Sequence, residues 1–255
     1  MKQLLTTLLL FLPLCVFAQS KESKQLYTQG KALVDAEKYE EALPYFQKSD
    51  SLDKARLKPT HKNYHRAELK IADCYEEIAS QADDEGHYNE ALTIQKNVVE
   101  IRQKVLGEEH PDYATALNNL ALYYDYNGNY NEAIRLGTIA MKIRKKILGE
   151  EHPDYAISLS NLAYYCDDLG NYTEAIRLET LALEIHKKVL GEEHREYANS
   201  LSNLAYYYNH NGNYTEAIRL GTLAMEISKK ALGEEHLDYA TSLYNLAIDY
   251  DALGN

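Results

Sequence analysis

The densest cluster of reactive side chains is an eight-residue segment that combines acids, a histidine and a tyrosine. It reads GEEHPDYA at Gly107, GEEHPDYA again at Gly149, GEEHREYA at Gly191 and GEEHLDYA at Gly233. Carboxylates and imidazoles at this density can bind divalent metals or transfer protons. Each copy, however, begins 42 residues after the previous one, and a catalytic site is rarely repeated along one chain. We therefore interpret the segment as one part of a structural repeat.

A metal site would require convergence of the histidines of this segment, which are His110, His152, His194 and His236. Stacked helices lie ~10 Å apart, whereas zinc needs its nitrogen ligands at ~2 Å from one point. The sequence therefore predicts connectors that bind no metal, with the acids as a solvated rim. On this interpretation, changing all four histidines to glutamine leaves stability nearly unchanged.

Other chemical motifs do not occur in the sequence. It contains no nucleophile elbow, P-loop, HExxH or Cys-x-x-Cys pattern, and these are the short motifs that most directly indicate a mechanism. We expect no enzymatic activity and no cofactor.

The residues between two connectors have the spacing of two amphipathic helices. Leu117, Leu120 and Ala121 recur at helical intervals in the first, and a second begins at Tyr130. Asp112 is expected to cap the first helix or to be an acid in its first turn. Gly128 is expected to end it in the left-handed conformation that helix C-termini often adopt.

This helix pair resembles the tetratricopeptide repeat. The motif runs from Asn119-Leu120-Ala121 through Tyr124, Gly128 and Tyr130 to Glu132-Ala133, and it recurs at Asn161 and Asn203 and begins again at Asn245. The period and the connector resemble the 42-residue kind found in kinesin light chain and in many bacterial proteins. The resemblance extends more weakly upstream. It divides the chain into a first shorter repeat (19–56), a degenerate second (57–106), three full repeats (107–148, 149–190 and 191–232) and an incomplete sixth (233–255).

The resemblance implies an all-α fold, a right-handed α-α superhelix, or solenoid, whose first helices line a concave groove that binds a peptide or a partner protein. Carried over residue by residue, the groove positions are Thr115, Asn118, Asn119, Leu122 and Tyr126; Ile157, Ser160, Asn161, Tyr164 and Asp168; Asn199, Ser202, Asn203, Tyr206 and His210; and Thr241, Tyr244, Asn245 and Ile248.

Two interpretations of the asparagine column (Asn119, Asn161, Asn203 and Asn245) remain open. A carboxamide both donates and accepts hydrogen bonds, so a column of them can hold the backbone of an extended peptide. The alternative is that each asparagine satisfies the hydrogen-bonding groups of a neighbouring helix's backbone.

Two further columns bear on packing. Tyrosines expected between helices are Tyr124, Tyr165, Tyr207 and Tyr250. The large residue of the family's second helix, Phe46 in the first repeat, is replaced by Gln95, Gly137, Glu179 and Gly221. We expect the later helices to pack more closely or to leave space between repeats.

The N-terminus and the composition limit the location and the partners. Residues 1–18 have the lysine, apolar run and small-residue ending of a signal peptide cleaved after Ala18, which predicts a periplasmic or secreted protein; a lipid-anchored form through Cys15 is a minor alternative. The apolar run is too short to span a bilayer. A net charge of −12 argues against nucleic acid and anionic membranes and favours neutral or basic partners. Cys74 and Cys166 are expected to be buried or half-buried thiols.

The leading functional hypothesis is a scaffold without catalytic activity that binds a peptide or protein. The alternative is the N-terminal regulatory array of a longer protein with a caspase-like protease or signalling domain. Because no second helix follows the one that starts near Asp238, we also expect that helix to fray or to pair with a second copy. Its apolar face is expected to comprise Leu243, Leu246, Ala247 and Tyr250.

Overall fold

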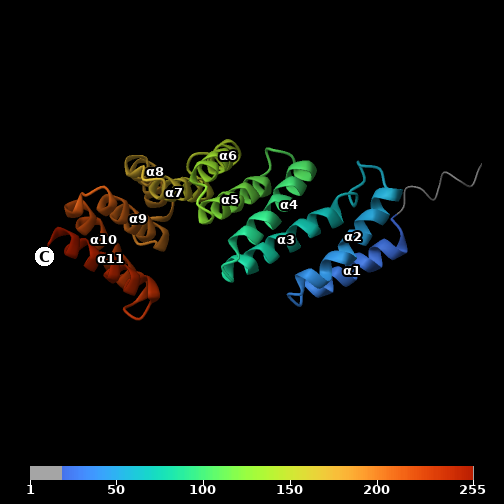
Figure 1. Ribbon diagram of the computed structural model, residues 1–255, viewed down its shortest axis with the longest axis horizontal. Helices are drawn as coiled ribbons and strands as arrows, with labels where there is room; N and C mark the ends of the chain where they lie inside the picture. The colour runs from blue at the N-terminus through green and yellow to red at the C-terminus, as the bar shows by residue number, and fades with distance from the viewer. Residues whose placement is uncertain (1–18, 255) are drawn as a thin grey trace, which may run out of the picture. The chain divides into compact units, whose positions relative to one another are not determined.

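The structure is a computed structural model that describes residues 19–254 (Figure 1). The expected signal peptide, residues 1–18, and Asn255 lie outside the described residues. Regular secondary structure within 19–254 is entirely helical, as expected. The chain divides into two compact units, one ending at Gly107 and the other starting at Glu108.

The first unit consists of two helix pairs. They are α1 (Lys21–Val34) with α2 (Tyr39–Arg56) and α3 (Arg66–Asp84) with α4 (Tyr88–Leu106). Phe46 of α2 is fully buried. A Cβ on Gly30 of α1 would meet the Phe46 ring at 2.9 Å, so only glycine lets the two helices approach around this ring.

The second unit repeats the same pairing three times and adds one helix. The helices are α5 (Pro111–Tyr126), α6 (Tyr130–Leu148), α7 (Pro153–Asp168), α8 (Tyr172–Leu190), α9 (Arg195–His210), α10 (Tyr214–Leu232) and α11 (Leu237–Leu253). Each helix packs on the next in sequence. Gly128, between α5 and α6, has φ 74°, the left-handed conformation expected there.

The connector histidines cap the first helices. Nδ1 of His110 accepts a hydrogen bond from the Asp112 backbone N–H at 3.1 Å, and His152 and His194 repeat this contact at the starts of α7 and α9. Asp112 is therefore the first-turn acid and His110 the cap. The prediction that glutamine at these positions leaves stability nearly unchanged stays a prediction. The capping contact favours a loss of stability instead, because a cap satisfies a backbone N–H that the helix leaves free.

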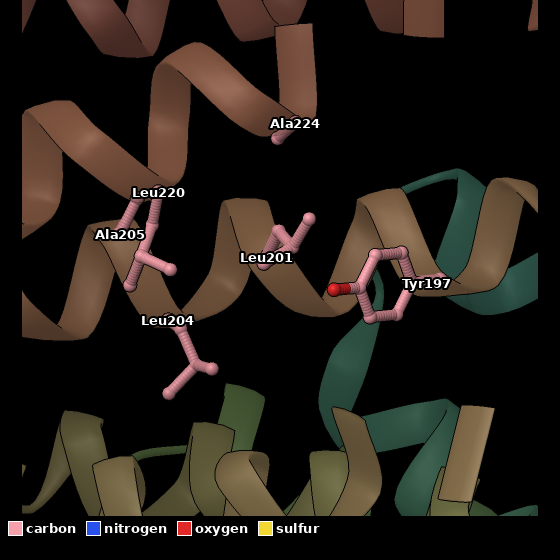
Figure 2. Close-up of a cluster of buried hydrophobic side chains, with 6 residues drawn as sticks. All are labelled: Tyr197, Leu201, Leu204, Ala205, Leu220 and Ala224. Atoms are coloured by element: carbon pink, nitrogen blue, oxygen red, sulfur yellow. The ribbon is translucent and has the colours of Figure 1, made fainter. Parts of the chain in front are cut away.

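The core between the helices of the second unit is built from alanines, leucines and two columns of tyrosines, which are Tyr113, Tyr155 and Tyr197, and Tyr123, Tyr165 and Tyr207. Figure 2 shows it in one repeat, where Ala205 of α9 lies beside Leu220 of α10. Tyr165 and Tyr207 are buried as expected, but the matching residue of α5 is Tyr123 and not Tyr124, which is only half-buried. Tyr250 is exposed. The predicted register was wrong by one residue in α5 and in α11. In α5 the two adjacent residues are both tyrosine, and in α11 the position of the buried tyrosine is occupied by Asp249.

The glycine at position 137 permits the close packing expected from the sequence. A Cβ there would lie 3.1 Å from a Leu162 methyl and 3.2 Å from the Tyr165 ring. The space that a large side chain would fill is therefore occupied from the neighbouring helix, α7.

Two predictions concern cysteines and membrane crossing. Cys74 and Cys166 are buried free thiols, as expected. Among the helices of residues 19–254, none combines the length and apolar character needed to cross a bilayer.

Candidate peptide-binding groove

A recess of about 570 Å³ lies along the first helices α7, α9 and α11. We call it the groove. It is lined by Ile157, Ser160, Asn161, Tyr164, His186, Glu196, Asn199, Ser200, Ser202, Asn203, Tyr206, Tyr207, Thr241, Ser242 and Asn245. Among these described residues none carries an ammonium or guanidinium group, so the surface offered to a ligand is amide, hydroxyl, aromatic and acidic.

Many of the residues predicted for the site lie in this recess. The structure brings together Ser160, Asn161, Tyr164, Ser202, Asn203, Tyr206 and Asn245, along with Ile157, Asn199 and Thr241. It leaves outside the lining Thr115, Asn118, Asn119, Leu122, Tyr126, Asp168, His210, Tyr244 and Ile248. The recess thus begins at α7, one repeat later than the sequence predicted.

The asparagine column is partly used within the protein. Nδ2 of Asn161 donates to Oδ1 of Asn118 on α5 at 2.9 Å. Nδ2 of Asn203 points to Oε1 of Glu179 at 3.5 Å. These amide donors link neighbouring helices, which favours the packing interpretation for Asn161 and Asn203. Both side chains still line the groove.

A buried carboxyl group lies directly beneath the groove. Glu179 of α8 has no exposed surface, and its Oε1 accepts from Ser160 Oγ at 3.2 Å. Its other oxygen, Oε2, has no hydrogen-bond partner among the described residues. Burial raises the pKa of this carboxyl to about 7, although hydrogen bonds from Ser200, Ser160 and Asn203 act in the opposite direction.

The hydroxyl of Ser200 connects Glu179 to a histidine. Ser200 Oγ lies 3.0 Å from Nδ1 of His186 and also hydrogen-bonds Glu179. A neutral imidazole with its proton on Nδ1 can donate to the Ser200 hydroxyl, which leaves the hydroxyl proton free for the carboxylate. Burial lowers the pKa of His186, so the imidazole is neutral and does not neutralise Glu179.

The C-terminal ends of the first helices carry a row of acids. Asp125 is buried, and burial, together with the nearby Asp168 carboxylate, raises its pKa. On the next helix, Nδ1 of His210 lies 3.0 Å from Oδ1 of Asp167, and the His210 ring packs 4.1 Å from that of Tyr206. Asp168 and His210 are thus engaged with neighbouring repeats.

Sequence reasoning missed several groove residues. His186, which lines the groove, and Glu179, which lies beneath it, come from the second helix of a repeat, whereas the groove was assigned to first helices alone. Glu196, Ser200, Ser242 and Tyr207 were also not assigned to the groove. The replacement of Phe46 by Glu179 was a visible signal, but it was taken as a matter of packing volume and not of charge.

Comparison with known proteins identifies the family. Tetratricopeptide repeat profiles match residues 78–146, 126–188 and 196–255, and a second such profile matches 26–56. The matches cover more than half of the chain, so the chain belongs to the tetratricopeptide repeat family. No curated protein matches it.

Similar solved structures have the same fold. A proposed kinesin light chain of Podosopora anserina with nearly identical TPR-like repeats shares 26% sequence identity, with 82% of this chain and 96% of that chain covered at a TM-score of 0.59. BtubC (BKLC) of P. vanneervenii shares 22% identity, with 85% and 84% covered at a TM-score of 0.66. The predicted fold class, an all-α superhelix of tetratricopeptide helix pairs, is confirmed.

Proposed function

We propose that the protein is a scaffold without catalytic activity whose groove binds an extended peptide or an extended segment of a partner protein. The observation that supports this most directly is the recess of about 570 Å³ along α7, α9 and α11. Tetratricopeptide repeat proteins are generally interaction scaffolds, and stacked repeats form extended concave binding surfaces.

The chemistry of the lining suits a peptide. Tyr164 and Tyr206 are 39% and 45% exposed, and tyrosine offers a flat, amphipathic contact area of the kind enriched at binding surfaces. The same groove is lined by Ser202, Asn199 and Asn203, whose polar groups suit backbone amides. A peptide in extended form leaves such amides available along its length.

The partner is a neutral or basic protein, since the net charge of −12 disfavours nucleic acid and anionic membranes.

The 42-residue period and the leader-like residues 1–18 favour a bacterial protein of the kinesin-light-chain-like repeat type, located in the periplasm or secreted. N-terminal sequencing of the native protein tests cleavage after Ala18. Its mass tests the alternative of a longer protein with a protease or signalling domain.

Selection and mutation test the groove itself. Twelve-residue peptides displayed in a library are selected on the full chain, and the best is measured against Ile157→Ala/Tyr206→Ala. Both side chains line the groove and are exposed, so the variant should fold normally yet bind at least tenfold more weakly, which is about 1.4 kcal/mol.

The matched control is Leu181→Ala/Tyr88→Ala, which removes an aliphatic and an aromatic side chain of similar exposure outside the groove. It should bind like the unmodified chain. Equal loss in both variants, or selection that enriches no peptide, argues against the groove as a peptide site.

Self-association through α11 is a further proposal. Leu243, Tyr244, Ile248 and Tyr250 are exposed on this helix, and clustered apolar side chains mark interaction surfaces. Leu246, which the sequence placed on the uncovered face, is instead buried, with a methyl 3.5 Å from where a Gly221 Cβ would lie.

A further inference from the structure

The carboxyl group of Glu179 lies under the groove without a cation to neutralise it. It is fully buried, and the side chains that hydrogen-bond it, Ser160, Ser200 and Asn203, line the groove. A single layer of hydroxyl and amide groups therefore separates the carboxylate from a bound ligand. Oε2 has no hydrogen-bond partner among the described residues, and a buried oxygen left in this state is costly.

The fold does not require an acid at this position. The corresponding residues of the other repeats are Phe46, Gln95, Gly137 and Gly221, and Gln95 is fully buried like Glu179. The same chain thus builds this position with an uncharged side chain of equal length, or with none. Because burying a carboxylate costs more than burying an amide of the same length, packing alone does not explain the acid at position 179.

The groove floor also changes charge between repeats. In the third repeat, Arg144 is buried and donates to Ser158 Oγ at 3.0 Å and to Thr115 Oγ1 at 3.1 Å. One repeat later its place is taken by His186, which is neutral, and Gly137 is replaced by Glu179. From the third repeat to the fourth, a buried guanidinium is therefore lost at one position of the second helix and a buried carboxyl group is gained at another.

We propose that the groove recognises a cationic side chain, lysine or arginine, of the bound peptide, seated over Ser160, Ser200 and Asn203 with Glu179 as its counter-charge. This rests on the proposed peptide-binding function and specifies its ligand. Half-buried Glu196 lines the same groove and adds to the negative potential. In this low-dielectric setting an opposite charge interacts more strongly than in water.

The titration of Glu179 gives the binding a pH dependence. The titratable groups nearest the carboxyl are Tyr207 on α9, whose pKa the Glu179 charge helps to raise, and neutral His186 on its own helix, which contacts Ser200. The polar contacts of the carboxyl come from Ser160 of α7 and from Ser200 and Asn203 of α9. Because burial raises the pKa of Glu179 to about 7, the empty site is largely protonated below that pH. A bound cation favours the ionised form, so affinity for it should rise between pH 6 and pH 8.

The direct test compares two peptides on the full chain. Selection at pH 8 from the twelve-residue library should enrich lysine or arginine at one position. The selected peptide and its copy with citrulline, an uncharged isostere of arginine, or with norleucine in place of lysine, are then titrated by calorimetry. On the unmodified chain, the neutral copy should bind at least tenfold more weakly than the charged peptide. On Glu179→Gln, the two peptides should bind about equally.

Controls separate this site from general charge. Glu184→Gln removes a carboxylate from an exposed position of the same helix and should keep the preference for the cation and the gain in affinity with pH. Glu179→Gln should abolish both. Circular dichroism shows whether Glu179→Gln folds. If it does not fold, the comparison of the charged peptide with its neutral copy on the unmodified chain tests the preference for a cation.

Each other result has a definite meaning. Selected peptides that bind in the groove but show no preference for a basic residue overturn this inference and leave the proposed function standing. If Glu184→Gln loses the preference for a basic residue as fully as Glu179→Gln does, the inference is also overturned, because the overall negative charge then explains the preference. If the library yields no ligand, the proposed function and this inference both fail.

Discussion

At the scale of single residues, the buried acids of the two units illustrate opposite electrostatic situations. Glu68 of α3 is 6% exposed and accepts from Lys104 Nζ at 2.6 Å, with Lys54 Nζ and His65 Nδ1 each at 3.0 Å. Burial alone would raise its pKa, but the hydrogen bonds and charges of these partners outweigh burial and lower the pKa to about 2. Glu179 has no such partners, and its pKa moves the other way.

Glu68 should therefore stabilise the fold only when it is ionised. A pKa depressed in the folded state contributes stability that is present above the unfolded value of about 4.5 and is lost as the pH falls toward about 2. Glu68→Gln should lower the free energy of unfolding by roughly 3 kcal/mol at pH 7 and by much less near pH 2. Urea denaturation of both proteins across this range measures the difference.

The matched control at this scale is Glu41→Gln, which removes an exposed carboxylate paired with Lys38 at 2.9 Å. Exposed ion pairs contribute little, so this variant should follow the unmodified chain at every pH. A Glu68→Gln effect that does not change between pH 7 and pH 2 would mean that side-chain shape, and not charge, is responsible.

At the scale of the helix, the connector histidines set where the first helices begin. Nδ1 of His152 accepts the Asp154 N–H at 3.1 Å, so the cap requires the tautomer with its proton on Nε2. The acid at position 154 then lies in the first turn, where it meets the positive end of the helix dipole. Pro153 occupies the first position of the helix, where its missing N–H costs nothing.

His152→Ala should lower the free energy of unfolding by about 1 kcal/mol, because the Asp154 N–H loses its acceptor. His152→Asn should restore most of this, since asparagine is a good capping residue, whereas glutamine is not among the favoured caps. Urea denaturation and hydrogen exchange in the first turn of α7 report the effect. Equal stability of the alanine and asparagine variants would show that the histidine does not act as a cap.

At the scale of the whole molecule, protection should be lowest in α11. This helix packs on α10, but Leu243, Tyr244 and Ile248 are exposed, so fewer buried contacts oppose local opening. Hydrogen exchange at micromolar concentration should be faster in residues 239–254 than in residues 197–232. Exchange in α11 that slows as the protein concentration rises would support self-association. Strong protection of α11 in a proven monomer would contradict the prediction that this helix opens most easily.

Much of the architecture follows from the sequence because it depends on local chemistry repeated at a fixed period. The connectors, the helix restart at Tyr130 and the left-handed Gly128 depend on residues close together in the chain. The family match depends on the same recurring positions. The helical spacing of apolar residues predicts which face of each helix is apolar, and the period of 42 residues repeats that face in every copy. The pairing of each helix with the next follows from these apolar faces.

Tertiary structure decided what depends on contacts between repeats. The recess starts at α7 rather than α5. The amide of Asn161 donates its hydrogen bond to Asn118, which is 43 residues away in the sequence. The environment of Glu179 is set by Ser160 on one side and Ser200 and Asn203 on the other. These groups come from two different helices, and only their packing removes water from the carboxyl group and raises its pKa. The sequence shows that an acid has replaced a glycine in the column; the fold shows that this acid is buried beneath a groove.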